Sequence, residues 1–252
     1  MQNIETNKSI TATLIIGLSA IICAAILGIA FFQTIFTVKS MKTIHVVGSA
    51  TKRYESDVAK WKVTILRTVD MNNLKTGYDL IQKDMRTIVD QLKSVGIQDK
   101  EITLQPIVTE PKMEPYRTVS LSDKEKQVGY NVRQTIFTIS SDIPKLEKLA
   151  LSPSVFLNKG ILLESSDLEY FISTLSEIKR GLVAEATIDS KKRAEEIANN
   201  TGVKLGKLIS GETGIFQITE SYSTEVSDSG IHDTSTRVKD ITITVTNTYA
   251  IN

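Results

Sequence analysis

Apolar and polar residues alternate in three different ways along the chain, and the first is a long apolar run near its start. Residues 10–36 contain no charged side chain. A helix needs about 20 apolar residues to cross a bilayer, whereas the apolar region of a signal peptide has only about 7–15. We therefore expect residues 1–9 to be a short tail and residues 10–38 to be a retained transmembrane anchor. Removal of a signal peptide near Gly28-Ile29-Ala30 is the alternative.

The second pattern is strict alternation, which is typical of half-buried strands. Apolar side chains alternate with Lys and Thr from Asp57 to Val69, and the alternation recurs over residues 127–140. Shorter stretches of the same kind predict further strands at residues 43–47, 101–109, 161–170, 204–219 and 240–252.

The third pattern has helical spacing. Apolar residues follow one another at spacings of four and three from Leu74 to Val95, and Gly96 is well placed to end the helix. Packing on a sheet is the interpretation we favour, and a coiled-coil seam is the alternative. A second long helix is expected at residues 175–200 and a short one at residues 143–151. The face of the second long helix is mostly small: Ile178, Leu182, Ala186, Ser190, Ala194, Ile197 and Ala198.

Long helices laid on mainly antiparallel strands predict an α+β fold over residues 39–252. Each half of this region has a strand, a long helix, a glycine stop and another strand, which is consistent with two similar lobes. The polar stretch between the last two strands is too long for a tight hairpin. We therefore expect a mobile loop near residues 217–239.

Charge and cysteine content narrow the function classes. Residues 1–38 hold one acid and one base, Glu5 and Lys8, so the remainder keeps the net charge of +1 of the whole chain. This balance argues against nucleic acid as a partner. Cys23 is the only cysteine, so the chain forms no internal disulfide.

Candidate chemistry is sparse. His45 falls in the first predicted strand, where we expect a partly buried and hydrogen-bonded side chain. His232 lies in the predicted loop near Asp228 and Asp233, but this spacing matches no established set of metal ligands. We therefore assign no catalytic residue, no metal and no cofactor.

An acidic cluster supports the one enzymatic alternative. Glu164, Asp167 and Glu169 lie on one predicted strand. A carboxylate-dependent hydrolase would use such a pair, although a solvated strand face is the commoner explanation.

The stretch from Val46 to Trp61 has a glycine and two basic residues after an apolar run, as a phosphate-binding loop would. A P-loop requires a second glycine, a Lys followed by Ser or Thr, and a helix. Here Gly48 stands alone, Arg53 follows Lys52, and a strand comes next. We expect a corner between two strands, with Trp61 facing the core.

Several short motifs follow one another over residues 43–252, among them Gly48-Ser49-Ala50, Ser56-Asp57-Val58-Ala59 and Gly129-Tyr130-Asn131-Val132. Together and in this order they resemble the SIMPL domain, found in bacterial envelope and periplasmic proteins and in a eukaryotic signalling adaptor. Ser56 and Ser190 depart from the family pattern, which usually has proline and alanine there. The positions that we assign as structural are Gly48, Ala50, Asp57, Gly129, Tyr130, Ala194, Ala198, Gly202 and Gly206. The other matching motifs are Gly96-Ile97, Glu101-Ile102, Pro115-Tyr116 and Arg193-Ala194-Glu195-Glu196-Ile197-Ala198.

The resemblance implies an exported, often oligomeric domain without an established catalytic activity, and in some members a link to oxidative-stress tolerance. We expect a single-pass protein of the bacterial inner membrane, with its C-terminal domain periplasmic. The basic residues after the apolar run favour the opposite orientation, which would make the protein a cytoplasm-facing adaptor. Ala20, Ala24 and Gly28 recur every four residues and form a candidate face for packing between membrane helices.

Overall fold

The computed structural model describes residues 17–19, 21–33, 42–114 and 126–252. Residues 21–33 are helical. Most of the predicted anchor's remaining residues, including Ala20, lie outside the described residues, as does the Pro115-Tyr116 motif. Within the described residues, no helix is long and apolar enough to cross a membrane.

The chain divides into two compact units built from segments that are far apart in sequence. Unit 1 comprises Met1–Ser49, Glu185–Gly214 and Thr244–Asn252. Unit 2 comprises Ala50–Ala184 and Ile215–Ile243. The units therefore do not correspond to the two halves of the sequence that share an order of predicted elements.

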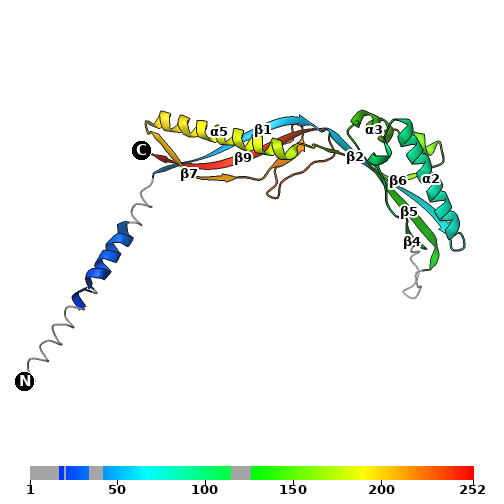
Figure 1. The fold of residues 1–252 in the computed structure, drawn as a ribbon, viewed down its shortest axis with the longest axis horizontal. Helices are drawn as coiled ribbons and strands as arrows, with labels where there is room; N and C mark the ends of the chain where they lie inside the picture. The colour runs from blue at the N-terminus through cyan, green and yellow to red at the C-terminus, as the bar shows by residue number, and fades with distance from the viewer. Residues whose placement is uncertain (1–16, 20, 34–41, 115–125) are drawn as a thin grey trace, which may run out of the picture. The chain divides into compact units, whose positions relative to one another are not determined.

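Unit 2 contains an antiparallel sheet, here called sheet B, with the order β3-β5-β2-β6 and β4 also paired to β5. Helices α2 and α3 cover one face of it (Figure 1). The alternating residues of β2 that point to this face, from Ala59 to Ile65, are fully buried against α2, and the middle of the apolar stripe of α2, from Ile81 to Leu92, is buried with them. The elements are β2 (Val58–Asp70), α2 (Leu74–Ser94), the 3-10 helix η1 (Asp99–Glu101), β3 (Ile102–Leu104), β4 (Val108–Met113), β5 (Gln127–Ser140), α3 (Ile143–Ala150), α4 (Ser154–Leu157) and β6 (Leu163–Phe171).

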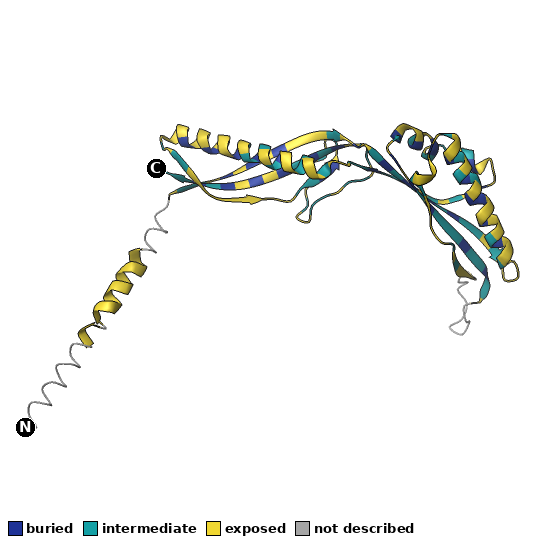
Figure 2. Ribbon diagram, in the orientation of Figure 1, coloured by how far each residue is buried: buried dark blue, intermediate teal, exposed yellow. Residues whose placement is uncertain are grey.

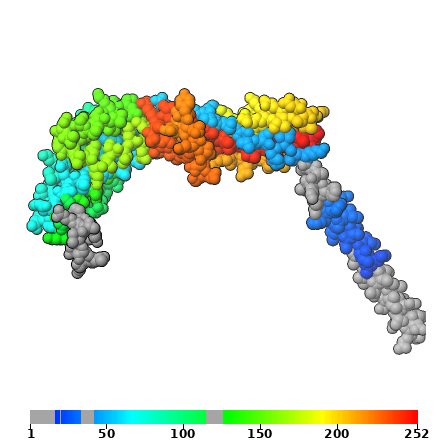
Figure 3. Space-filling model, turned by 180° about the vertical axis from the view of Figure 1, so that it is seen from behind, coloured from blue at the N-terminus to red at the C-terminus, as the bar shows by residue number. Residues whose placement is uncertain are grey.

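A second antiparallel sheet, sheet A, has the order β1-β9-β7, with β8 also paired to β9. Helix α5 runs along one face, and the residues of the sheet that point toward it are buried (Figure 2). The elements are β1 (Thr43–Glu55), α5 (Leu175–Thr201), β7 (Leu205–Thr213), β8 (Gln217–Glu220) and β9 (Val238–Ile251). The opposite face carries exposed residues, and β1 and β9 reach the molecular surface there (Figure 3).

The predicted fold class is confirmed in its main features: the strands are antiparallel and two long helices cover them. The helix at Leu74–Val95 packs on sheet B, as the sheet-packing interpretation requires. Trp61 is buried in that core, with its ring 5.9 Å from the ring of Phe156.

Three boundaries were wrong. The strand expected at residues 101–109 is two strands, β3 and β4, and the strand expected at residues 204–219 is β7 and β8. The predicted loop at residues 217–239 includes all of β8 and the start of β9. Its mobility stays a prediction.

The end expected for the first strand, at residue 47, was also wrong, because β1 continues through Gly48 to Glu55. The expected junction between two strands is present within Val46–Trp61, but it lies at Ser56 and Asp57. A Cβ on Gly48 would lie 2.2 Å from the carbonyl oxygen of Ala186 and 2.3 Å from the amide nitrogen of Ser190. Glycine is needed here because the backbone of α5 touches the strand. The position serves helix packing rather than a turn.

Candidate functional site

A pocket of about 340 Å³ lies in unit 2, between β8 and the loop that follows it. Three acidic side chains, one imidazole and two hydroxyls surround it. The lining residues are Thr219, Glu220, Ser223, Glu225, Ile231, His232 and Asp233.

The loop is positioned mainly by the side chain of Gln217. Its amide nitrogen donates to the carbonyl oxygen of Ser227 over 2.8 Å, and its amide oxygen accepts the N–H of Ile231 over 3.0 Å. An isolated bridge joins Ile218 to His232. These bonds close the loop back on β8, so the pocket is a defined feature of the fold.

One residue of the loop has an uncommon backbone conformation. Tyr222, at φ 66°, is 83% exposed, and the guanidinium of Arg53 lies 4.0 Å from the centre of its ring. Arg53 also donates two hydrogen bonds to Asp240, over 2.8 and 2.9 Å. The bond to Asp240 raises the pKa of Arg53 above its ordinary value, and the same pairing lowers the pKa of Asp240. Arg53 is therefore part of a fixed cluster rather than a free basic side chain.

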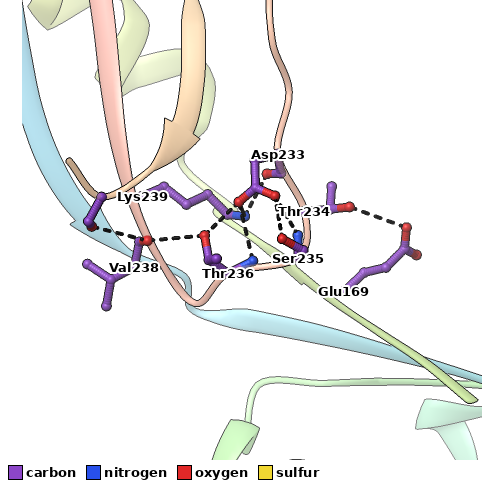
Figure 4. Close-up of polar contacts among 8 residues, drawn as sticks. Glu169, Asp233, Thr234, Ser235, Thr236, Val238 and Lys239 are labelled. Atoms are coloured by element: carbon purple, nitrogen blue, oxygen red, sulfur yellow. Dashed lines mark hydrogen bonds and ion pairs between the residues drawn. The ribbon is translucent and has the colours of Figure 1, made fainter. Parts of the chain in front are cut away.

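Asp233, in the wall of the pocket, is held in place by the buried side chain of Lys239 (Figure 4). Lys239 is only 2% exposed, and its ammonium donates to the carbonyl oxygen of Asp233 over 2.6 Å. The same nitrogen lies 3.3 Å from Oδ2 of Asp233. Ser235 and Thr236 complete the cluster by donating side-chain and backbone hydrogen bonds to this carboxylate.

Burial acts on both charged partners of this cluster. It disfavours the ionised form of Asp233, but the bonds from Thr236 and Ser235 and the charge of Lys239 outweigh it. The pKa of Asp233 therefore lies well below its ordinary value. Burial lowers the pKa of Lys239, and the carboxylate of Asp233 opposes that shift.

The pocket presents hydrogen-bond acceptors, which suit the amine or hydroxyl groups of a small polar molecule. His232 and Asp233 lie together in its lining, as the sequence suggested, whereas Asp228 does not line it. Over the ranges that the structure describes, no group of three or more His, Cys, Asp or Glu side chains is arranged to hold a metal.

The acidic cluster of β6 lies on the face of sheet B away from α2. Glu169 pairs with Lys60 over 3.0 Å, and Glu164 pairs with Arg133 over 2.8 Å. Asp167 is opposite Lys62 in the register of β2 and β6. Each carboxylate thus has a basic neighbour, which is the arrangement of a solvated strand face.

The motif positions have identifiable structural roles. Ala194 and Ala198 are buried on α5, Gly202 follows that helix with φ at +75°, and Gly206 and Ala50 lie in β7 and β1. Gly129 and Tyr130 lie in β5, where a Cβ on Gly129 would be 2.2 Å from the carbonyl oxygen of Val69.

Asp57 precedes β2 rather than starting it. Its carboxylate accepts hydrogen bonds from the hydroxyl and the N–H of Ser173, the latter over 2.7 Å, and these bonds lower its pKa. It therefore ties the start of β2 to the residues that follow β6.

The two departures from the family pattern both make specific contacts. Ser190 is buried and its hydroxyl accepts a hydrogen bond from the side-chain amide of Asn247, which is also buried. The N–H of Ser56 donates to the carbonyl oxygen of Arg237 over 2.8 Å, a bond that a proline could not make.

His45 was expected to be partly buried, but it is exposed. Its Nδ1 lies 2.9 Å from the hydroxyl of Thr248 on the neighbouring strand β9. It therefore belongs to the open face of sheet A rather than to a core.

Sequence reasoning missed Lys239, which does not line the pocket but holds its wall residue Asp233. The alternation of Ile241, Ile243 and Val245 extends backwards to position 239, so a lysine stands on the buried side of β9. That break in the pattern was the available signal. Its partner Asp233 could not be identified in the same way, because it lies in a loop.

The architecture defines an α+β protein of two antiparallel sheets with a long helix on each. The family model SIMPL, described as a protein of unknown function (DUF541), matches residues 44–249. The chain therefore belongs to the SIMPL family. A search of curated proteins found no match.

Proposed function

We propose that the chain is a membrane-anchored SIMPL-domain protein of the bacterial inner membrane. Its C-terminal domain lies on the periplasmic side. It acts without catalysis, through oligomeric assembly or binding, and it contributes to protection of the envelope under oxidative stress.

The observation that carries the anchor is the exposed apolar surface of the helical residues 21–33. Large apolar side chains there are half or more exposed, with Leu27 at 71%. Such a surface is costly in water and favourable in lipid. The exposed side chains are Ile21, Ile22, Ile26, Leu27, Ile29, Phe31 and Phe32.

Anchoring is tested by extracting membranes with alkaline carbonate. We expect the full chain to stay in the membrane pellet, and Leu27→Lys, at the centre of the run, to move it toward the soluble fraction. A wild-type chain that is released by carbonate would contradict anchoring.

The orientation rests on the family resemblance against the count of basic residues after the apolar run. A reporter fused after Asn252 decides: activity of a reporter that works only outside the cytoplasm supports the proposal, and activity of a cytoplasmic one supports the adaptor.

For assembly, the open face of sheet A is a better candidate than its edges. Two register irregularities interrupt β7, and the carboxylate of Asp189 on α5 accepts the N–H of Ser49 on β1 over 2.9 Å. Both features obstruct pairing with another strand. By contrast, the open face carries an uncharged row on β9 formed by Thr244, Thr246 and Thr248.

Light scattering on the detergent-solubilised chain tests this assembly. Thr246→Arg places a long charged side chain at the centre of the open face, so we expect a lower oligomer mass. Thr76→Arg, at an exposed position of α2, is the matched control and should leave the mass unchanged. A wild-type chain that is strictly monomeric would contradict assembly altogether.

A further inference from the structure

The segment that links the pocket to β9 lies across the ends of two strands of unit 2. Residues 233–237 have no helix or strand of their own. The carbonyl oxygen of Thr234 accepts the N–H of Tyr170 on β6 over 2.8 Å, and the carbonyl oxygen of Arg237 accepts the N–H of Ser56. We call residues 233–237 the strap.

The backbone amides of Tyr170 and Ser56 report on the strap, because each donates its hydrogen bond to a strap carbonyl oxygen. The next amide, that of Asp57, donates instead to the carbonyl oxygen of Phe171 on β6 over 3.1 Å. Release of the strap would therefore free the amides of Tyr170 and Ser56, whereas the contact between the start of β2 and the end of β6 would remain.

Side chains fasten the strap at both ends. At its start, the buried ammonium of Lys239 holds the backbone and the carboxylate of Asp233. At its end, the guanidinium of Arg237 pairs with Glu55 over 2.8 Å and with Glu147 over 3.3 Å. Glu147 also accepts a hydrogen bond from the hydroxyl of Tyr170 over 2.8 Å. Burial, together with this bond, raises the pKa of Tyr170 to about 12.

The closed strap leaves polar groups unpaired. Three buried side-chain atoms in the described part of the chain lack a protein hydrogen-bond partner, and two of them are Nε of Arg237 and Oγ of Ser56. A buried polar group without a hydrogen-bond partner destabilises the state that contains it. Taking the charge of Lys239 out of water is also costly unless its partner is in place. A few strong contacts thus hold the strap closed, while the unpaired polar groups and the buried charge favour its opening. A segment with so small a net stabilisation is expected to open locally.

We propose that the strap detaches from the end of β6 without unfolding sheet B, and that Lys239 is the hook that holds it closed. Asp233 is both a strap residue and a wall of the pocket, so detachment opens the pocket on that side. Access to the pocket is therefore coupled to the Lys239–Asp233 contact. This device does not depend on the anchor or on assembly.

Amide hydrogen exchange on the full chain in detergent micelles, followed by NMR over a series of low urea concentrations, tests the proposal. We expect the amides of Tyr170 and Ser56 to exchange faster than that of Asp57 and with little dependence on urea, as for a local opening. The proposal is overturned if Tyr170 and Ser56 exchange at the rate of Asp57 with the same strong dependence on urea. The wild-type chain alone decides between these outcomes.

Variants identify the hook. Lys239→Met keeps the length of the side chain and removes the charge, so we expect exchange at Tyr170 and Ser56 to rise at least about tenfold, with Asp57 unchanged. Lys207→Met, at an exposed lysine of β7, is the matched control and should change none of the three. Equal acceleration at all three amides in Lys239→Met would show that Lys239 supports the whole sheet, and would overturn its role as the hook. If Lys239→Met does not fold, Arg237→Gln removes the fastening at the other end and is read in the same way.

Discussion

The two units solve the same packing problem, a helix on an antiparallel sheet, with opposite kinds of side chain. In unit 2 the core between sheet B and its helices is filled by large residues, including Trp61 on β2 and Phe156 on α4, whose rings are in contact. In unit 1 the buried stripe of α5 is Ala186, Ser190, Ala194 and Ala198, and Gly48 lies against the backbone of the helix.

The difference shows where each unit is vulnerable. A core of large side chains loses stability when a side chain is shortened, because a cavity remains. A contact between backbones loses stability when a side chain is added, because nothing can move aside. Unit 1 also buries a hydrogen bond between Ser190 and Asn247, so part of its specificity is polar.

The largest effect is expected from Trp61→Ala in unit 2. Removing a fully buried aromatic side chain costs about 3–5 kcal/mol in free energy of unfolding. Urea unfolding followed by far-ultraviolet circular dichroism measures it, because Trp61 is the only tryptophan and fluorescence is lost with it. Trp61→Phe should cost less. A loss under about 1 kcal/mol for Trp61→Ala would contradict the dependence of unit 2 on large side chains.

Gly48→Ala should come next and should act on unit 1. The added methyl group would collide with the backbone of α5, at a cost of about 3 kcal/mol. Gly181→Ala is the control on the same helix, since a Cβ there meets nothing within 4 Å. Exchanging glycine for alanine in an exposed helix should stabilise by about 0.5–1 kcal/mol. The same urea measurement applies, and equal effects of the two substitutions would refute the close contact.

A smaller loss is expected from Ser190→Ala. It leaves the amide of Asn247 without its main partner, at a cost of about 1–3 kcal/mol in free energy of unfolding. Replacing both partners, as in Ser190→Ala with Asn247→Leu, should recover most of that loss. A double-mutant cycle measures the coupling. If the two losses simply add, the hydrogen bond does not contribute.

The smallest difference that we expect between the two units is in their stability to acid. The pKa of Asp189 in unit 1 is lowered, chiefly by the N–H of Ser49, and those of Asp57, Asp233 and Asp240 in unit 2 are lowered by their own partners. A carboxyl group with a lowered folded pKa stabilises fully above its unfolded value of 3.8, and the stabilisation is lost as the pH falls through the lower folded value.

Stability should therefore be flat from pH 7 to about pH 5 and decline below about pH 4. Unit 2 should lose amide protection first, because more of these carboxylates lie there. Hydrogen exchange at successive pH values checks the order, and Asp233→Asn should flatten the decline in unit 2. Asp228→Asn, at an exposed acid in the same loop, should not.

Much of unit 2 could be predicted because its pattern is local. The stripe from Leu74 and the alternation over residues 127–140 correspond to α2 and β5. Unit 1 was harder to predict from the sequence. The need for glycine at position 48 comes from its contact with α5, which lies about 140 residues away in sequence. A glycine directly after an apolar run therefore suggested the end of a strand, whereas the strand in fact continues.

The candidate site depended even more on contacts that a sequence does not display. Lys239 was detectable as a charged residue on the buried side of β9. The segment that it holds came from a polar loop, whose composition indicated only the absence of regular structure. The carboxylates that the sequence brought forward, on β6, are instead each beside a basic residue on an open face.

The position of β9 at the centre of sheet A has a consequence for biosynthesis. This strand, Val238–Ile251, pairs with β1, which begins at Thr43, so the sheet joins nearly the whole sequence end to end. Contacts of such separation form slowly, because a long loop must close before they are rewarded. During synthesis β1 must wait for a partner that is made much later, whereas β2, α2 and β5 can associate before then. The part of unit 2 that contains sheet B is therefore expected to fold first, and sheet A to form only after β9 has been made.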